Sequence, residues 1–197
     1  MNYLLHTEEL EGRQYRPEEP VIFLKADSAL LKNGKPFFVP DWAGRVDYEA
    51  ELVVRICRLG KGIPVRFAHR YYDAVTVGID FTARDIQQKA RSQGLPWTIC
   101  KGFDGSAVTG EWCTVNDEER SALTFRLDLN GQTVQQGNPS DMLFSVDEII
   151  SYLSRFFTLR TGDLIFTGTP AGVGPVKIGD HLEGYLGAER VLDFYCR

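Results

Sequence analysis

Apolar residues along this chain gather in short runs, which predict strands more than long helices. The runs occupy residues 21–25, 51–56, 75–81, 164–167 and 191–195, with a further strand expected near residue 182. Runs of this length, rich in β-branched side chains and bounded by Gly, Pro and Asn, are typical of strands. Residues 124–129 and 133–136 flank an Asn-Gly pair at 130–131 and predict a β-hairpin, and the Asn-Gly pair at 33–34 predicts another turn.

Helical signals are fewer and mark three places. Residues 145–148 have the spacing of a capping box, and residues 149–157 carry one apolar face of the helix that should follow. A shorter capping pattern at residues 82–85 predicts a helix that begins there and ends at Gly94. Residues 67–72 favour a short helix. The whole pattern predicts an α+β protein that is mainly β.

Composition narrows the class of protein. A chain of 197 residues with 43% hydrophobic and 25% charged residues fits one globular domain over residues 1–197. The net charge of -5 excludes the basic footprint of a nucleic-acid-binding protein, and no apolar run approaches the ~20 residues of a membrane helix. The four cysteines have no metal-finger spacing, so we expect reduced thiols in a cytoplasmic protein without a signal peptide.

Three carboxylates on two apolar strands are the first candidates for chemistry. Glu49 and Glu51 alternate along one strand and should share a face, and Asp80 lies near the end of the strand at 75–81. Buried carboxylates that lie side by side need a cation, and Mg²⁺ or Mn²⁺ prefers oxygen ligands. The alternative is an exposed strand face on which two glutamates are ordinary. An aspartate at a strand end is also a common turn former or helix cap.

Charged and polar residues after Asp80 suggest contacts with an anionic substrate. Arg84 and Gln87 lie one turn apart on the predicted helix, where an arginine could hold a carboxylate, although an ordinary surface face fits the spacing equally well. Lys101 follows an apolar stretch and could offset oxyanion charge, whereas most lysines are simply solvated.

Two further features lie near the ends of the chain. His6 and Glu9 can meet across one helical turn, where the carboxylate would orient the imidazole as a general base; the alternative is a mobile polar segment. The glycine-rich stretch at residues 168–174 lacks the Lys of a P-loop, which argues against nucleotide binding there. Thr169 in that stretch could donate to an anion or belong to a plain loop.

Taken in order, these motifs resemble the fumarylacetoacetate hydrolase family over nearly the whole chain. The stretches that carry the resemblance are N-Y-x-x-H-x-x-E at 2–9, P-E-E-P-V-I-F-L-K at 17–25, Y-E-A-E-L at 48–52, G-I-D-F-T-A-R-D-I-Q at 78–87, G-L-P-W at 94–97, K-G-F-D at 101–104, Q-G-N at 136–138, T-G-T-P-A-G-V-G-P at 167–175 and G-D at 179–180. Family members normally carry a strand and a glycine before the Asn-Tyr pair. Here Met1 precedes Asn2 directly, so the domain is expected to lack the usual first strand.

The resemblance implies a role for each candidate residue. Glu49, Glu51 and Asp80 match the metal ligands of the family, which implies Mg²⁺ or Mn²⁺. His6 and Glu9 match its water-activating pair, and Lys101 matches its active-site lysine. The positions near the keto-acid end of the substrate are matched by Arg84, Gln87 and Thr169. The implied fold is a mixed β-sandwich roll, usually a homodimer.

The implied reaction is hydrolysis of the C–C bond of a 2,4-diketo acid, such as an acylpyruvate or fumarylpyruvate, to pyruvate and a carboxylic acid. The same metal site could serve an isomerase of 2-hydroxyhepta-2,4-diene-1,7-dioate type or an oxaloacetate decarboxylase. A protein that binds keto acids without turnover is the alternative from another class. The small keto acid is the expected partner, with no nucleic acid and no membrane.

Overall fold

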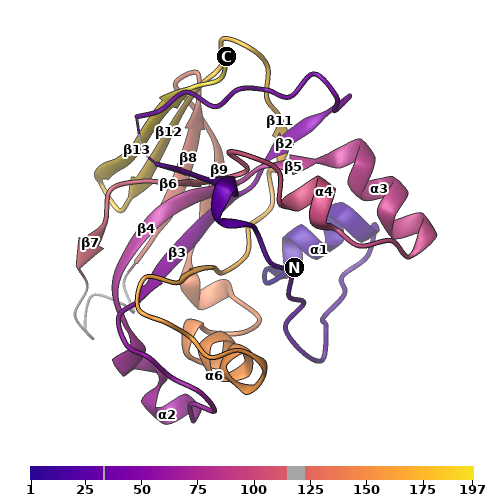
Figure 1. Cartoon of the computed structure of the whole chain (residues 1–197). Coiled ribbons are helices and arrows are strands. Elements are labelled where there is room, and N and C mark those ends of the chain that lie inside the picture. Colours follow the sequence, from indigo (N-terminus) through magenta and orange to yellow (C-terminus); the bar gives the residue numbers. More distant parts are fainter. Residues whose placement is uncertain (33, 115–122) are drawn as a thin grey trace.

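The computed structural model describes residues 1–32, 34–114 and 123–197, without the side chains of Leu10 and Glu11. The turn predicted at residues 33–34 includes Asn33, which lies outside the described residues. Figure 1 shows several sheets with short helices around them, which confirms an α+β fold that is mainly β. Among the described residues, no helix has the length and apolar character to cross a bilayer.

The strands of the described residues form three sheets. A 6-stranded sheet runs β1-β6-β4-β3-β10, with β7 paired to β4. Its strands are β1 (Leu30–Lys32), β3 (Ala50–Ile56), β4 (Tyr72–Asp80), β6 (Ala107–Thr109), β7 (Cys113–Thr114) and β10 (Leu164–Phe166). A 4-stranded antiparallel sheet consists of β13 (Glu189–Tyr195), β12 (His181–Leu186), β8 (Phe125–Leu129) and β9 (Gln132–Gly137). A 3-stranded sheet consists of β11 (Gly174–Pro175), β2 (Val46–Tyr48) and β5 (Thr82–Ala83).

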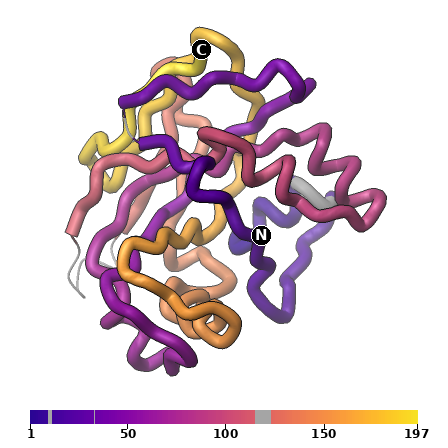
Figure 2. Tube along the Cα trace, in the orientation of Figure 1, coloured from indigo at the N-terminus to yellow at the C-terminus, as the bar shows by residue number. Residues whose placement is uncertain are grey.

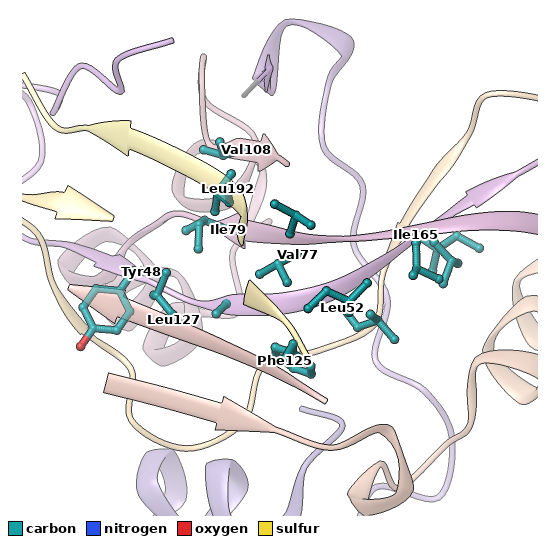
Figure 3. Close-up of a cluster of buried hydrophobic side chains, with 14 of the residues drawn as sticks. Tyr48, Leu52, Val77, Ile79, Val108, Phe125, Leu127, Ile165 and Leu192 are labelled. Atoms are coloured by element: carbon teal, nitrogen blue, oxygen red, sulfur yellow. The ribbon is translucent and has the colours of Figure 1, made fainter. Parts of the chain in front are cut away.

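The core lies between the central strands β3 and β4 and the 4-stranded sheet. Strand β8 contacts β3, and β12 and β13 contact β4. Figure 3 shows side chains from both sheets filling the space between them, among them Leu52, Val77, Ile79, Phe125, Leu127 and Leu192. All six are at most 1% exposed. Because alternate strand residues point to opposite faces, this packing leaves Glu51 and Asp80 on the other face of the central strands.

The helices lie in two groups around the sheets (Figure 1). One group contains α1 (Leu4–Glu11), α3 (Arg84–Gln93) and α4 (Thr98–Lys101), and the other contains α2 (Val65–Ala68) and α6 (Val146–Phe156). The described residues also form the short 3-10 helices η1 (Asp27–Ala29), η2 (His69–Tyr71) and η3 (Pro139–Asp141). The N-terminus lies near the middle of the view in Figure 2, whereas the C-terminus lies at the top.

Most of the predicted elements are present. The hairpin of β8 and β9 surrounds a turn in which Asn130 has a φ of 52°. Helix α6 starts with the predicted capping box, in which Ser145 and Glu148 exchange hydrogen bonds. Its apolar face is only partly buried, since Ile149 and Ile150 are in the core but Phe156 is 53% exposed.

Two local predictions are wrong. Residues 21–25 form no strand; they run as an irregular segment whose Val21 and Leu24 side chains are exposed. The pattern at residues 82–85 is not a capping box either, because Thr82 belongs to β5 and pairs with Asp47 of β2. Helix α3 therefore begins at Arg84, after Ala83, with no side-chain cap.

Candidate active site

The three predicted carboxylates come together on one face of the central strands. The β3–β4 register places Glu51 opposite Gly78, and the Asp80 N–H donates to the Glu49 carbonyl (2.8 Å) just beyond β3. Glu49, Glu51 and Asp80 are 5%, 5% and 1% exposed, and each offers an oxygen within 4.8 Å of the others. An exposed strand face is therefore excluded.

Glycine at position 78 makes room for this arrangement. A Cβ at Gly78 would lie 2.6 Å from Val53 Cγ2 and 2.7 Å from the Val108 carbonyl oxygen, much closer than normal contact. Strand β4 can thus lie close to β3 and β6 at the point where the carboxylates meet. Gly168 serves the same cluster from the loop after β10, because its N–H donates to Glu51 Oε2 (2.7 Å).

Two lysines supply positive charge to the buried carboxylates. Lys101 Nζ, at the end of α4, lies 2.6 Å from Glu49 Oε2 and 2.7 Å from Asp80 Oδ2. Lys25 Nζ lies 2.7 Å from Asp80 Oδ1 and also donates to the Ser106 carbonyl (3.0 Å) and to the carbonyl of Lys101. The side chain of Lys101 is buried, and its Nζ lies over the ring of Phe23, 5.1 Å from the ring centroid.

The two glutamates have opposite pKa shifts. Burial alone raises the pKa of Glu49, but Lys101 and Arg84 outweigh it and hold this pKa well below its usual value. Burial, together with the charges of Asp80 and Glu49, raises the pKa of Glu51 to about 8. Within the described part of the chain, Glu51 accepts a backbone N–H from Gly168 and forms no ion pair with a side-chain cation. It is therefore the carboxylate that a bound cation would stabilise most.

Arg84 lies against the cluster rather than in open space. Its Nη2 donates to Glu49 Oε1 (2.6 Å), its Nε to Asp47 Oδ2 (2.8 Å) and its Nη1 to Gln87 Oε1 (2.5 Å). Asp47 is 1% exposed, and its Oδ1 also forms an ion pair with Arg45 Nε (2.6 Å). Because the Gln87 oxygen is occupied by Arg84, the Gln87 amide NH₂ is the group left to meet a ligand.

His6 and Glu9 meet as predicted, on helix α1. His6 Nδ1 lies 3.3 Å from Glu9 Oε2, and Glu9 accepts in turn from the Gly172 N–H (3.2 Å). His6 is 2% exposed. Burial lowers the pKa of His6 despite the opposing effect of the Glu49 and Glu9 charges, so the neutral imidazole is favoured.

Asn2 anchors the start of α1. Its Nδ2 donates to the carbonyls of Thr167 (2.8 Å) and Phe144 (2.9 Å), and its Oδ1 accepts from the Phe144 N–H (2.8 Å). The Asn2 carbonyl accepts from the Leu143 N–H. Tyr3 is 4% exposed and forms a bridge with Met142. The helix that carries His6 is thereby held to Thr167, directly after β10, and to residues 142–144.

Thr169 lies in the loop after β10, 1% exposed, and its hydroxyl oxygen accepts from Gln135 Nε2 (2.8 Å). It lines a cavity of about 870 Å³ together with other candidate residues. The candidates on that cavity wall are His6, Glu49, Glu51, Asp80, Gln87, Lys101 and Thr169. Glu9 and Arg84 lie behind this wall and reach it through His6, Glu49 and Gln87.

The donor set fits a hard divalent cation. Three carboxylates with oxygens within 4.8 Å of one another suit Mg²⁺ or Mn²⁺, which accept oxygen ligands and leave positions open. Burial first, and then the charges of Asp80 and Glu49, raise the pKa of Glu51, and a bound cation would oppose all three effects. The residues present can therefore hold the metal that the family resemblance implies.

Sequence reasoning missed three residues around this site, of which Asp47 and Gln135 are buried and Lys25 has a side chain that is 11% exposed. Lys25 lay in a stretch predicted as a strand, and Asp47 and Gln135 carried no signal of their own. Asp47 is two residues before Glu49, and this spacing could have suggested a carboxylate on the same face. Gln135 comes from the hairpin β8–β9, and only the three-dimensional packing brings it to Thr169.

Comparison with known proteins agrees with this geometry. The fumarylacetoacetate (FAA) hydrolase C-terminal family model matches residues 1–191. The mouse (Mus musculus) mitochondrial oxaloacetate tautomerase FAHD1 is 39% identical over 183 residues, covering 92% of this chain and 82% of the relative.

Two solved structures have the same fold. Fumarylpyruvate hydrolase from Pseudomonas aeruginosa, in complex with Mn²⁺ and pyruvate, is 36% identical with a TM-score of 0.91, covering 99% of this chain and 85% of that one. The 2-hydroxyhepta-2,4-diene-1,7-dioate isomerase from Mycobacterium marinum is 36% identical with a TM-score of 0.83, covering 92% of this chain and 70% of that one. With its carboxylate cluster, its ordered motifs and these matches, the chain belongs to the fumarylacetoacetate hydrolase family.

Proposed function

We propose that this protein is a divalent-metal-dependent hydrolase that cleaves the C–C bond of an acylpyruvate to give pyruvate and a carboxylic acid. The observation that carries the proposal is that His6 and the three carboxylates open on one cavity. A base for water and a site for a metal thus face the same space. The Mn²⁺ and pyruvate named with the Pseudomonas hydrolase support the choice of cofactor and product.

Glu49, Glu51 and Asp80 would hold the metal. When bound, a Mg²⁺ or Mn²⁺ ion supplies Lewis-acid stabilisation of negative charge on the oxygens of the 2-oxo acid. Arg84 would orient Glu49 through its hydrogen bond to Oε1, and the Gly168 N–H would orient Glu51 through its hydrogen bond to Oε2. The Gln87 amide and the Thr169 hydroxyl lie on the cavity wall, where they can donate to the substrate carboxylate.

His6 would activate the attacking water. Because Glu9 accepts from Nδ1–H, the tautomer leaves Nε2 unprotonated and able to take a proton. Burial keeps the pKa of His6 low, so the imidazole is neutral and ready to act as a base at neutral pH. The water would attack the distal carbonyl carbon of the substrate, and the proton would reside on His6 Nε2.

Lys101 would support the oxyanion that this attack creates. Its ammonium has three N–H donors, two of which are directed at Glu49 and Asp80. The remaining N–H can meet an oxyanion in the cavity, whose wall includes Lys101. Collapse of the oxyanion breaks the C–C bond, and His6 can return its proton to the pyruvate carbon.

A second candidate function is favoured by the similarity to the oxaloacetate tautomerase and the dienoate isomerase. Both names describe proton transfer on a 2-oxo or enol acid without a water nucleophile. In this chain His6 could move the proton, the three carboxylates would hold the metal as in the hydrolysis, and Lys101 would keep its contacts with Glu49 and Asp80. Hydrolysis differs from these proton-transfer reactions because it requires room for a water molecule beside His6.

The test is release of pyruvate from acetylpyruvate by the purified protein with Mg²⁺, followed by the same assay with EDTA. We expect release that EDTA abolishes. Parallel assays follow the ketonisation of enol-oxaloacetate and the isomerisation of the dienoate by ultraviolet absorbance. Turnover of either of these with no pyruvate released from acetylpyruvate would assign the second function and reject the first.

A further inference from the structure

Gln135 is a buried amide that connects two sheets behind the cavity. It lies on β9 of the 4-stranded sheet and is 2% exposed. Its Oε1 accepts from the Ala50 N–H (2.8 Å), and its Nε2 donates to the Pro170 carbonyl (2.9 Å) and to Thr169 Oγ1 (2.8 Å). Ala50 is the residue between Glu49 and Glu51, so one amide touches both the carboxylate strand and the Thr169 loop.

The orientation of this amide is fixed by its backbone partners. The Ala50 N–H can only donate and therefore requires the oxygen end of Gln135. The Pro170 carbonyl can only accept and therefore requires the NH₂ end. A flipped amide would oppose both groups, so the assignment does not depend on a choice between nearly identical atoms.

This orientation fixes the role of the Thr169 hydroxyl. The two hydrogens of Gln135 Nε2 go to the Pro170 carbonyl and to Thr169 Oγ1. Thr169 Oγ1 is therefore an acceptor toward Gln135, and its own hydrogen must point elsewhere. Within the described parts of the chain, the only acceptor near this hydroxyl is the Pro170 carbonyl at 3.5 Å, which is too far for a good O–H···O bond.

We propose that Gln135 is a positioning residue that makes Thr169 a hydrogen-bond donor toward the carboxylate of a bound 2-oxo acid. The inference rests on the proposed function, since it takes a 2-oxo acid as the ligand of this cavity. Thr169 lies on the cavity wall and Gln135 does not, so Gln135 acts through the hydroxyl and the loop. A hydroxyl that donates can pair with a carboxylate oxygen of the ligand. A hydroxyl whose hydrogen is already used could only accept, and the carboxylate oxygen would then lack a partner.

The choice of glutamine follows from the same geometry. The site needs one acceptor for Ala50 N–H and two donors for Pro170 and Thr169, and among the side chains of this length only a primary amide offers all three. An ionised glutamate at this position would oppose the Pro170 carbonyl and would turn the Thr169 hydrogen toward itself. A methionine would keep the volume but offer no donor and no strong acceptor.

The experiment is a double-mutant cycle on ligand binding. Pyruvate affinity for the Mn²⁺-loaded protein is measured by calorimetry for the wild type, Gln135→Met, Thr169→Val and the double variant. Mn²⁺ affinity and melting temperature are measured for each to confirm folding. Gln136→Met is the matched control, because Gln136 is the next residue on β9 and is exposed.

We expect Gln135→Met and Thr169→Val each to weaken pyruvate binding about tenfold, the size expected for a hydrogen bond to a charged group. Adding Gln135→Met to Thr169→Val should weaken it by no more than about twofold further, because the hydroxyl is already gone. Mn²⁺ affinity should change much less than pyruvate affinity. Gln136→Met should leave both affinities as in the wild type.

Three outcomes would overturn the inference: an unchanged pyruvate affinity in Gln135→Met, an equal loss in the presence and absence of the Thr169 hydroxyl, or no pyruvate binding by the Mn²⁺-loaded wild type. If Gln135→Met does not fold, unchanged pyruvate binding by Thr169→Val overturns it instead. These readouts do not require turnover. A protein that binds pyruvate in this way but does not release it from acetylpyruvate would support the role of Gln135 and reject the proposed hydrolysis.

Discussion

Two groups of potential metal ligands stand out among the described residues, and they differ in every respect except donor number. One consists of Glu49, Glu51 and Asp80 on the central strands, and the other consists of His181, Glu183 and Asp193 on the β12–β13 hairpin. Each group offers three ligand atoms within 4.8 Å of one another. Proximity of donors alone would rank them equally.

Burial and charge pairing separate the two groups. On the hairpin, Arg190 Nη1 lies 2.6 Å from Glu183 Oε1 and 3.1 Å from Asp193 Oδ2, and His181 Nε2 lies 2.7 Å from Asp193 Oδ1. These side chains are partly exposed and none lines the large cavity. In the central cluster the carboxylates are buried, and among the described residues Glu51 has only a backbone hydrogen-bond donor. The comparison favours the central cluster as the candidate cation site, because buried carboxylates gain more from a bound ion than partly exposed carboxylates that are already paired.

We expect the largest effect when one candidate ligand is replaced in each of the two groups and metal binding is compared. Glu51→Gln should lower Mn²⁺ affinity by about a hundredfold or more, because it removes a negative charge from a buried oxygen site, and turnover should fall by about a thousandfold. Glu183→Gln should leave both unchanged. Calorimetry with Mn²⁺ and a pyruvate-release assay measure the two quantities. Equal losses in both variants would break the comparison.

A second test separates metal binding from proton transfer. His6→Ala should lower kcat by about 100- to 10,000-fold, the range typical of a lost general base, while Mn²⁺ affinity stays within about threefold of the wild type. The carboxylates would keep their positions, because α1 is held by Asn2 and Tyr3 rather than by His6. Steady-state kinetics and Mn²⁺ calorimetry provide the readouts. A large loss of Mn²⁺ affinity would show that the two parts are not separable.

The pH dependence of stability sharpens the contrast further. The pKa of Glu51 is raised from 4.5 to about 8, so the protonated carboxyl stabilises the metal-free fold below about pH 4.5, and this contribution is lost as pH rises through about 8. The melting temperature of the metal-free wild type should therefore fall between pH 5 and 8 relative to that of Glu51→Gln, which has no proton to lose. Thermal melts across this range compare the two, and parallel curves would contradict the prediction.

The smallest effect is expected on the hairpin. His181→Ala removes a partner of Asp193 whose side chain is 23% exposed, together with the ring stacked on Tyr195 at 4.3 Å. Because surface ion pairs contribute little, the melting temperature should fall by about 3 °C or less, with pyruvate release unchanged. Differential scanning calorimetry and the same assay provide the measurements. A loss of Mn²⁺ binding in this variant would revive the hairpin group as a site.

Local hydrophobic patterns predicted a strand correctly where the segment is also buried and pairs with neighbouring strands. The apolar runs that form β3 and β4 occupy the centre of the 6-stranded sheet, and the run that forms β10 pairs with β3. Residues 21–25 carry a similar apolar run, yet they cover the site instead of joining a ladder, with Lys25 directed at Asp80. Hydrophobic pattern alone does not distinguish a strand from an apolar segment that lies over a cavity.

The candidate site was predictable to the extent that it depends on one strand or one helical turn. The shared face of Glu49 and Glu51 follows from strand geometry, and the His6–Glu9 contact follows from helical spacing. The meeting of Lys25 with Asp80 and of Gln135 with Thr169 joins residues 55 and 34 positions apart. Such contacts depend on tertiary packing, which no local pattern encodes.

The burial of Glu51 has a consequence for how the protein exchanges protons with its surroundings. With a pKa of about 8, this carboxyl is largely protonated at neutral pH, yet a metal ligand must be ionised. In the proposed metal site, uptake of a divalent ion at neutral pH would therefore be an exchange, in which the ion enters and a proton leaves for the solvent. A fall in pH would favour the empty site, and a rise would favour the loaded one, so the pH of the compartment would help to set how much of the protein is ready to work.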